Sequence, residues 1–286
     1  MTKRKDVTSA CVFSQPPLRA ALPVGRGMGF HWTRRGRVGI QAADLSAIRT
    51  TSNKSARILA TLKNELRKRI REGHSETAAR FFKTGPGEYG QGDRFLGIRV
   101  PEIRAVAKMD DGMADIRSLL HSKWHEERLL ALLILVRRFE RGDESARKSI
   151  FDFYLSATRW INNWDLVDLS AYKIVGAWLL ERPRIPLWKL AASGNLWERR
   201  IAIVSTFAFI RCGDLEETFA LSEHLLNSPE DLMHKACGWM LREAGKRDIR
   251  ALERFLAAHR CSMPRTMLRY AIEKFPEARR KEYLAR

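Results

Sequence analysis

Cysteine is scarce in this chain of 286 residues, and its four cysteines are far apart. None of them forms the C-x-x-C pair that structural zinc sites use, and their spacing does not suit a disulfide framework. We therefore expect neither a metal ion nor a disulfide, and a reducing compartment fits best. The four positions are Cys11, Cys212, Cys237 and Cys261.

Long apolar runs are also missing. The longest, residues 129–136, is far shorter than the roughly 20 residues that a helix needs to cross a bilayer. No secretory apolar segment follows the start. The seven histidines show no HExxH spacing, and no serine or cysteine nucleophile comes with a credible base. These absences argue against a membrane protein, an exported protein and a protease or esterase, and we expect a cytoplasmic protein without a cofactor.

Acidic residues are few relative to basic ones. The chain has 33 Asp and Glu against 52 Lys and Arg, which gives a net charge of +19 and a pI near 10.3. This excess favours a polyanionic partner, either nucleic acid or an acidic membrane surface, over a charge that serves solubility alone. Hydrophobic residues make up 45% of the chain, so most of it can bury a core.

The first 54 residues differ from the rest, because they hold ten Lys or Arg and only two acids, Asp6 and Asp44. They show no sustained periodicity, so we expect a disordered basic extension over residues 1–54 and a folded domain over 55–286. Three interpretations of the extension stay open. It is an arm that adds nonspecific attraction to nucleic acid, an organellar transit peptide, or sequence added by an upstream start codon.

Convincing β-strand alternation is absent, whereas apolar residues recur at three- and four-residue spacing from Ser55 onward. Breakers such as Pro183 and Gly213 fall between these runs. The pattern predicts an all-α protein. The expected helices cover residues 55–72, 76–84, 101–109, 113–121, 124–141, 143–158, 163–181, 185–193, 196–211, 214–227, 231–246, 248–259, 264–274 and 276–284.

The helices also repeat, with a period of about 36 residues. Residues 124–131 resemble residues 196–202, so Arg128 and Arg200 are 72 residues apart, with Trp164 midway and Lys235 a further 35 residues on. Two helices per unit predict an α-solenoid of HEAT-like repeats, whose inner helices line one concave surface. We expect this surface to be basic and to carry the four marked residues side by side.

The start of the expected helix 163–181 combines an aromatic residue with a carboxylate. Asn163 is a good N-cap, and Asp165 meets the positive end of the helix dipole. Trp164 and Asp168 are four residues apart and share a helix face. Asp168 lies beyond the first turn, in an apolar run. It therefore either pairs with a cation of a neighbouring repeat or stabilises a developing positive charge, such as the oxocarbenium-like sugar of glycosidic cleavage.

A basic stripe runs along the expected helix 231–246, where Lys235, Trp239, Arg242 and Lys246 are spaced four, three and four residues apart. Cations around a large aromatic residue suit a phosphate backbone with an exposed sugar or base. The alternative is a solvated basic face whose tryptophan packs on the neighbouring repeat.

Arg199 and Arg200 come early in a helix, where the dipole disfavours a cation. A bound anion would explain this position, and so would an ion pair of Arg200 with Glu198 or with an acid of an adjacent repeat, such as Asp165. Both interpretations remain open at this point.

A glycine-rich loop covers residues 84–97, and residues 85–90 (GPGEYG) match the pattern G-x-G-x-x-G. The match follows a helix instead of a strand, so a dinucleotide site is disfavoured. A tight turn, or a loop that contacts DNA through its backbone N–H groups, fits the residues better.

Several segments, taken in order, resemble the AlkD-type bacterial DNA alkylation-repair glycosylases, which are built from HEAT-like repeats. The resemblance spans roughly residues 57–275. The matching segments are 79–83 (ARFFK), 95–98 (FLGI) with Pro101, 164–168 (WDLVD), 195–200 (NLWERR) and 235–243 (KACGWMLRE).

The resemblance implies hydrolysis of the N-glycosidic bond of cationic N3- and N7-alkylated purines in double-stranded DNA, without a deep base-flipping pocket. It implies that Asp168 stabilises the oxocarbenium-like sugar and positions water, that Trp164 and Trp239 contact the lesion's sugar, and that Arg200 holds the backbone beside it. Phe81 stands where relatives can carry Tyr, and it offers no hydroxyl. The remaining residues that we expect to contact DNA are basic: Lys83, Arg199, Lys235, Arg242, Lys246, Arg265 and Arg269.

Some relatives bind DNA without glycosylase activity, so a non-catalytic protein that binds damaged or branched DNA is the alternative. A HEAT-type scaffold for an acidic protein is a third interpretation. We expect a monomer that is associated with the nucleoid of a bacterium, and organellar targeting through residues 1–54 stays open.

Overall fold

The computed structural model describes residues 42–112 and 114–285, which divide into two units between Thr50 and Thr51. The unit from Thr51 onward holds the predicted site and is described by itself. Within the described residues, the secondary structure consists of helices and of one isolated bridge between Arg94 and Trp124. The fold is therefore all-α, as predicted.

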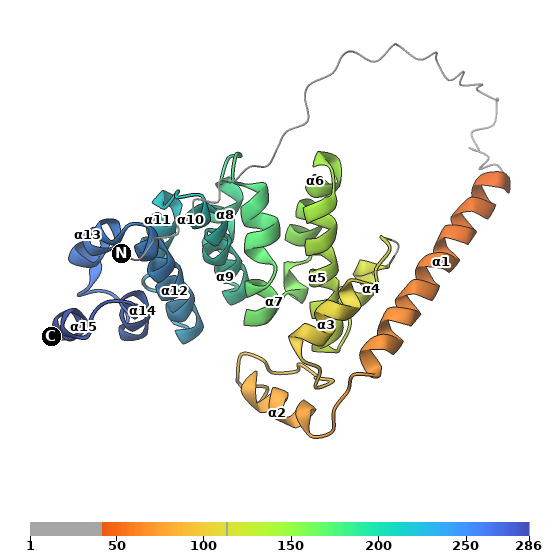
Figure 1. Cartoon of the computed structure of the whole chain (residues 1–286), viewed down its shortest axis with the longest axis horizontal. Helices are drawn as coiled ribbons and strands as arrows, with labels where there is room; N and C mark the ends of the chain where they lie inside the picture. The colour runs from red at the N-terminus through yellow and green to blue at the C-terminus, as the bar shows by residue number, and fades with distance from the viewer. Residues whose placement is uncertain (1–41, 113, 286) are drawn as a thin grey trace, which may run out of the picture. The chain divides into compact units, whose positions relative to one another are not determined.

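Most of the helices are short, and they follow one another in chain order (Figure 1). They are α1 Ala42–Arg67, α2 His74–Phe81, α3 Val100–Ala107, α4 Ile116–Leu120, α5 His125–Arg141, α6 Glu144–Ser156, the 3-10 helix η1 Thr158–Trp160, α7 Trp164–Asp168, the π-helix η2 Tyr172–Gly176, α8 Ile185–Ala191, α9 Leu196–Ser205, α10 Phe207–Arg211, α11 Glu216–His224, α12 Asp231–Arg247, α13 Ile249–His259, α14 Arg265–Ala271 and α15 Glu277–Leu284.

Successive repeats pack through one row of helices. In this row α5 contacts α7, α7 contacts α9, α9 contacts α12, and α12 contacts α14. The other helices pack against the row: α4 and α6 contact α5, α8 contacts α9, and α11 and α13 contact α12. Helix pairs that stack in chain order are consistent with the predicted α-solenoid of helical repeats.

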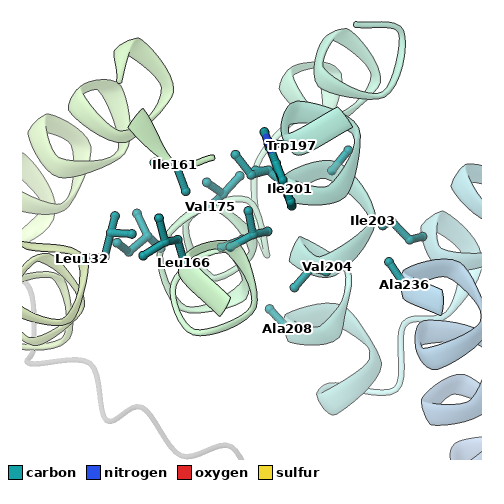
Figure 2. Close-up of a cluster of buried hydrophobic side chains, with 14 of the residues drawn as sticks. Leu132, Ile161, Leu166, Val175, Trp197, Ile201, Ile203, Val204, Ala208 and Ala236 are labelled. Carbon is teal, nitrogen blue, oxygen red and sulfur yellow. The ribbon is translucent and has the colours of Figure 1, made fainter. Parts of the chain in front are cut away.

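A continuous apolar core joins the row helices. Leu132 of α5, Leu166 of α7, Ile201 of α9 and Ala236 of α12 are all fully buried (Figure 2). Full burial of a leucine or isoleucine side chain contributes about 1.5–3 kcal/mol. The apolar periodicity of the sequence therefore marks the faces that hold one repeat against the next.

The expected helix 163–181 is interrupted. It consists of α7, a turn at Leu169 and Ser170, and the π-helix η2. Ser170 Oγ donates to the carbonyl oxygen of Leu166 at 2.5 Å and is paired with the Tyr154 hydroxyl at 2.8 Å. A side chain that occupies a backbone carbonyl in this way disrupts the regular helix, which explains why α7 ends at Asp168.

The expected helix 196–211 is also divided, into α9 and α10. Ser205 Oγ donates to the Ile201 carbonyl oxygen at 2.6 Å, and Thr206 Oγ1 donates to the Ile203 carbonyl oxygen at 2.7 Å. Two successive hydroxyl residues therefore mark the break, again because they bond to backbone carbonyls of the preceding turn.

The predicted N-terminal extension falls outside the described residues as far as residue 41, and so does Cys11. Residues 42–54 belong to α1, so the helical region begins before Ser55. Among the described residues, Cys237 and Cys261 are free thiols, no three potential metal ligands form a group, and no helix combines the length and apolarity needed to cross a bilayer.

Candidate functional site

Asp168 and Arg200 form a bidentate ion pair that links α7 to α9. Nε of Arg200 donates to Oδ1 of Asp168 at 2.9 Å, and Nη2 donates to Oδ2 at 2.8 Å. Nη1 donates to the carbonyl oxygen of Leu232 in α12 at 2.6 Å. The guanidinium thus ties three consecutive row helices together. The Asp168 side chain keeps 14% of its surface exposed, against 6% for Arg200.

The ion-pair partner of Arg200 is an acid of the adjacent repeat, as one interpretation predicted, but it is Asp168 and neither Asp165 nor Glu198. Glu198 accepts a hydrogen bond from Thr158 at 2.7 Å, and Asp165 is paired with His125 at 2.9 Å. Asp168, at the end of the short helix α7, meets Arg200 instead. The position of Arg200 within its helix is therefore explained by an acid of the preceding repeat.

The electrostatics of Asp168 reflect two opposing influences. Burial raises the pKa of its carboxyl above the ordinary value, and the guanidinium of Arg200 opposes this rise through charge and hydrogen bonding. Two charge-assisted hydrogen bonds favour the ionised form. Few solvent molecules screen this carboxylate, so it interacts more strongly with a nearby positive charge than an exposed carboxylate would.

Trp164 is held by an aromatic stack. Its ring stacks on Phe82 at 5.2 Å between centroids, and Phe82 in turn stacks on Phe95 at 4.9 Å. Phe81 meets Trp164 edge-on at 5.8 Å and is largely exposed. As predicted, Asn163 caps α7, because its Oδ1 accepts a hydrogen bond from the backbone N–H of Trp164 at 2.8 Å. The tryptophan is thus fixed in place while part of its ring remains accessible.

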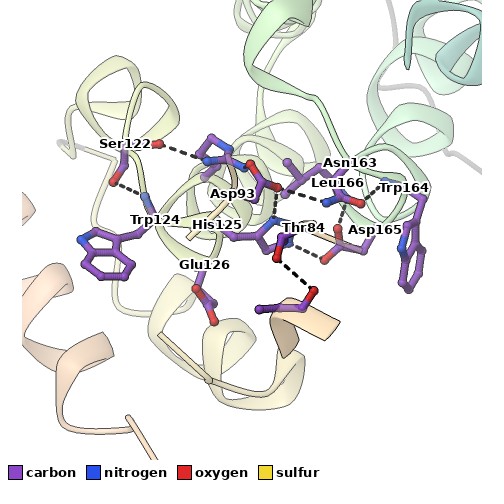
Figure 3. Close-up of polar contacts among 12 residues, drawn as sticks. Thr84, Asp93, Ser122, Trp124, His125, Glu126, Asn163, Trp164, Asp165 and Leu166 are labelled. Carbon is purple, nitrogen blue, oxygen red and sulfur yellow. Dashed lines mark hydrogen bonds and ion pairs between the residues drawn. The ribbon is translucent and has the colours of Figure 1, made fainter. Parts of the chain in front are cut away.

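Beneath this stack lies a buried polar network that the sequence analysis did not predict (Figure 3). His125 lies between two carboxylates, with Nδ1 3.3 Å from Asp93 and Nε2 2.9 Å from Asp165. Asp93 also accepts hydrogen bonds from Arg128 at 2.7 Å and from Asn163 at 3.1 Å. Because Asp165 and Asn163 begin α7, the network fixes the start of the helix that carries Trp164 and Asp168.

The histidine in this network is charged at neutral pH. Burial favours its neutral form, but the charges and hydrogen bonds of Asp165 and Asp93 outweigh burial and raise the pKa of His125 to about 9. The pKa of Asp93 is lowered, because His125, Arg128 and Asn163 overcome its desolvation. Arg128 is 4% exposed and belongs to this network, and Arg200 is 5% exposed, so the prediction that these two side chains lie on a surface beside Trp164 is wrong.

Glu126 holds the backbone of residues 95–98 (FLGI), one of the segments that carry the family resemblance. Its buried carboxylate accepts hydrogen bonds from the backbone N–H groups of Leu96 at 2.8 Å, Gly97 at 2.8 Å and Ile98 at 3.3 Å. Gly97 has φ +78°, and a Cβ there would lie 2.7 Å from the backbone nitrogen of Ser75. The segment is therefore a backbone structure built around one carboxylate.

The glycine-rich loop is a turn that satisfies its own backbone. The Glu88 carboxylate accepts from the N–H of Gly85 at 2.8 Å, and Gln91 Oε1 accepts from the N–H of Gly87 at 2.8 Å. These two N–H groups are therefore already bonded within the loop. This arrangement favours the tight turn over backbone contacts from these two residues to DNA.

Tyr89, from the same loop, belongs to the site although the sequence analysis did not single it out. Its ring meets Trp197 of α9 edge-on at 6.1 Å. Burial raises the pKa of its phenol and the charge of Glu88 adds to the rise, while the Trp164 side chain and the charges of Lys235 and Arg200 oppose it. The one aromatic residue of the glycine-rich segment 85–92 (GPGEYGQG) was the signal available in the sequence.

The cations of the predicted stripe on α12 are paired with acids of α12 or with a nearby acid outside it. The ion pairs are Lys235–Asp231 at 2.7 Å, Arg242–Glu243 at 3.3 Å, Lys246–Glu243 at 2.7 Å and Arg242–Glu273. Trp239 is partly exposed and lies 6.0 Å from the Phe207 ring of α10. Any phosphate bound along this stripe would compete with these acids for the Lys and Arg side chains.

The other predicted DNA contacts are distributed over three elements. Arg199 is paired with Glu230, and Arg265 donates to the carbonyl oxygen of Leu284 at 2.5 Å. Arg269 is exposed on α14, which packs on α12. Lys83 is exposed at the start of the glycine-rich loop, with φ +51°.

The chain resembles known proteins in sequence and in fold. A family model described as DNA alkylation repair enzyme matches residues 62–275. A solved structure, described as a predicted DNA alkylation repair enzyme from Enterococcus faecalis, has a similar fold, with a TM-score of 0.55 and 15% sequence identity. The similarity covers 73% of this chain and 98% of that chain. No curated protein matches the chain.

Proposed function

The chain belongs to the family of DNA alkylation repair enzymes, and we propose that it is a monofunctional DNA glycosylase that removes cationic N3- and N7-alkylated purines from duplex DNA. Membership of the family supports a role in DNA repair and binding to DNA. The alkylpurine substrate and the glycosylase reaction are the proposal.

The observation that carries the proposal is the shielded carboxylate of Asp168 one helical turn from Trp164. Cleavage of the N-glycosidic bond leaves positive charge on the deoxyribose, and a nearby ionised carboxylate stabilises that charge. Indole rings attract cations through their quadrupole. An acid and an aromatic ring on one helix face, in a chain of net charge +19, suit a cationic sugar better than they suit a phosphate.

The proposed reaction does not require the protein to activate the damaged base as a leaving group. An alkylated purine already carries a positive charge, so it leaves as a neutral base when it takes the electron pair of the broken bond. A water molecule then attacks C1′ of the sugar and loses one proton to the Asp168 carboxylate, which passes it on to solvent, so that the products are the free base and the C1′ hydroxyl. Each Asp168 oxygen accepts one hydrogen bond from Arg200 and keeps lone-pair capacity, so the carboxylate can orient that water. In this proposal Trp164 and Trp239 contact the lesion's sugar, and Arg200 keeps Asp168 ionised and in place.

A second candidate is a non-catalytic protein that binds damaged or branched DNA. The ion pair itself favours this reading, because Asp168 is satisfied by Arg200 and links two repeats. Phe81, which lacks a hydroxyl, points the same way. Both candidates share the DNA-binding surface and differ in base release alone.

Release of methylated purines from alkylated duplex DNA separates the two candidates. The glycosylase proposal expects purified protein to release N3-methyladenine or N7-methylguanine from methylated duplex, and to release no base from unmethylated duplex of the same sequence. Binding to both duplexes without any released base would support the second candidate instead.

A further inference from the structure

A cavity of about 420 Å³ lies between α10 and α12. Its volume falls within the range of ligand-binding sites, roughly 300–1,000 Å³. The residues that line it are Phe207, Ile210 and Arg211 from α10 and Glu243, Lys246 and Arg247 from α12. Lys246 is the one predicted DNA contact among them, so the cavity adjoins the α12 stripe.

The lining of this cavity is electropositive. Three of its residues are cations, and its one acid, Glu243, is paired with both Arg242 and Lys246. Arg211 and Arg247 are exposed, and within the described part of the chain neither takes part in an ion pair. In this respect they differ from the cations of the α12 stripe, each of which is paired with an acid.

The first acid that follows each of these arginines in the sequence has another partner. Asp214, three residues after Arg211, is paired with Arg184. Asp248, directly after Arg247, accepts a backbone N–H at 3.0 Å as the N-cap of α13. Both arginines therefore keep positive charge and hydrogen-bond donors for a ligand.

Arg211 and Arg247 are the last residues of α10 and α12. The helix dipole stabilises a cation at each of these ends, so it explains either arginine alone. It does not explain why the two ends meet, with Nη2 of Arg247 donating to the carbonyl oxygen of Arg211 at 3.4 Å. A guanidinium has five N–H donors, so this contact leaves most of those on Arg247 unused. Two like charges held beside one cavity match an anion.

A row of aromatic rings leads from this cavity to the proposed lesion site. Helix α10 packs on both η2 and α12. Phe207, which lines the cavity, meets the Tyr172 ring of η2 edge-on at 5.2 Å and lies 6.0 Å from the Trp239 ring of α12. All three rings are partly exposed. Cations beside accessible aromatic rings are typical of surfaces that bind the phosphates and the sugars or bases of nucleic acid.

The spacing along α12 fits DNA as the source of the anion. Trp239 and Lys246 are seven residues apart, which is about 10 Å along the helix axis. A DNA strand rises about 3.4 Å per nucleotide along the duplex, so a phosphate in the cavity would lie about three nucleotides from a sugar at Trp239.

We propose that the cavity between α10 and α12 binds one backbone phosphate of duplex DNA through Arg211 and Arg247, and that Phe207 packs against the adjoining deoxyribose. Phosphate contacts fix the register of a protein on DNA, so this contact holds the strand whose damaged sugar lies at Trp239. The inference rests on the proposed function for that sugar and on family membership for DNA as the partner. Its test needs DNA binding alone.

The test uses the full chain and a short undamaged duplex. Arg211→Gln/Arg247→Gln removes both charges, and we expect its Kd to be about 10-fold higher than that of the wild type, because hydrogen bonds between charged groups are lost. The slope of log K against log salt should fall by about 0.9 in total, since the two arginines neutralise one phosphate. Arg250→Gln/Arg254→Gln, which changes two exposed arginines of α13, is the matched control and should bind like the wild type.

Phe207→Leu tests the aromatic part of the site. Loss of the ring should raise the Kd by about 5-fold, as for loss of one stacking contact with nucleic acid. The salt slope should stay unchanged, because no charge is removed. Thermal unfolding of each variant shows whether the fold is kept.

A duplex with a tetrahydrofuran abasic-site analogue locates the contact. Replacing one phosphate about three nucleotides from the analogue with a neutral methylphosphonate should weaken wild-type binding and leave the double variant Arg211→Gln/Arg247→Gln unaffected. The reason is that the two changes remove the same interaction.

Wild-type affinity and salt slope in the folded double variant would overturn the inference, as would equal losses in both proteins at every methylphosphonate position. If inorganic phosphate then raises the melting temperature of the wild type alone, the cavity binds a free anion instead of DNA. If the wild type releases no base, the proposed function fails, while binding to the undamaged duplex still decides the inference.

Discussion

Asp168 meets a structural demand with the side chain that the proposed reaction would also use. Its pair with Arg200 connects two repeats, and the guanidinium reaches a third through the carbonyl of Leu232. Burial alone would favour a neutral carboxyl, so the arginine is what keeps a charged group in this place. A carboxylate that must remain ionised with little water around it needs such a partner, whether or not it also faces a substrate.

The charge of the buried His125 can be tested through the pH dependence of the protein's stability. Its pKa is raised from the ordinary 6.5 to about 9 in the folded state. The stabilisation it contributes is therefore fully present below about pH 6.5 and is lost as the pH rises through about 9, a change of roughly 3 kcal/mol. The measurement is the free energy of unfolding in urea at several pH values, for the wild type and for His125→Gln.

We expect the wild type to exceed His125→Gln in stability by the largest margin near pH 6 and by a much smaller margin near pH 10. The exposed His224 provides the control, because His224→Gln should leave the pH dependence of the wild type unchanged. A margin between wild type and His125→Gln that stays constant over this range would show that the buried histidine is not charged.

At the scale of helices, the part of the chain that carries the site departs from regular geometry. The π-helix η2 follows α7 directly and packs on α9. Gly176 closes η2, and a Cβ there would lie 2.2 Å from the carbonyl oxygen of Ser205. This oxygen belongs to the backbone, so it cannot move aside easily. The close approach of η2 and α9 brings the row helices of the site together.

Gly176→Ala should therefore destabilise the protein by about 1–3 kcal/mol, as expected for overpacking at a close backbone contact. Gly194→Ala is the matched control, because a Cβ at Gly194 meets nothing within 4 Å. Thermal or urea unfolding of the two variants gives the comparison. Equal stability of Gly176→Ala and Gly194→Ala would contradict the close packing of η2 on α9.

The helices were predictable from sequence to the extent that local signals define them. Apolar spacing located most of them, and Asn163 and Asn195 act as caps, each accepting a backbone N–H. Trp164, Arg200 and Lys235, which the period of about 36 residues relates to one another, lie in the early turns of α7, α9 and α12. The breaks at Ser170 and Thr206 were not predicted, because a hydroxyl that bonds to a carbonyl leaves no trace in the apolar period.

The site was predictable where it depends on one helix and not where it depends on several. Asp168 and Trp164 were identified from their spacing, and an ion pair with a neighbouring repeat was one of two readings of Asp168. The contacts of Tyr89 with Trp197 and of His125 with Asp93 and Asp165 join residues 32 to 108 positions apart. Such contacts depend on how the repeats stack, which periodicity does not specify.

At the scale of the whole molecule, the dominant property is positive charge. The net charge of +19 already counts every acid of the chain, including those that pair with the α12 stripe, and family membership supports DNA as the polyanion. Several of the cations at the site are paired with acids of their own chain, so phosphates must displace some of these contacts. Binding should then release counterions from the DNA and depend strongly on salt.

We expect the affinity for undamaged duplex DNA to fall by about 10³-fold or more between 50 and 200 mM salt, as for proteins that make several phosphate contacts. Fluorescence anisotropy with a labelled duplex measures this directly. An acidic protein that displaces DNA at equal concentration, together with weak salt dependence, would favour the scaffold interpretation.

The most direct test of the central claim is the rate of base release by Asp168→Asn under single-turnover conditions on methylated duplex. The claim predicts a rate lower by about 10²–10³-fold, typical for loss of an electrostatic group at a transition state. DNA affinity should be unchanged or higher, because a repelling charge is removed. Asp152→Asn, which changes an exposed carboxylate on α6, should keep the wild-type rate. Wild-type base release by a folded Asp168→Asn protein would contradict the account.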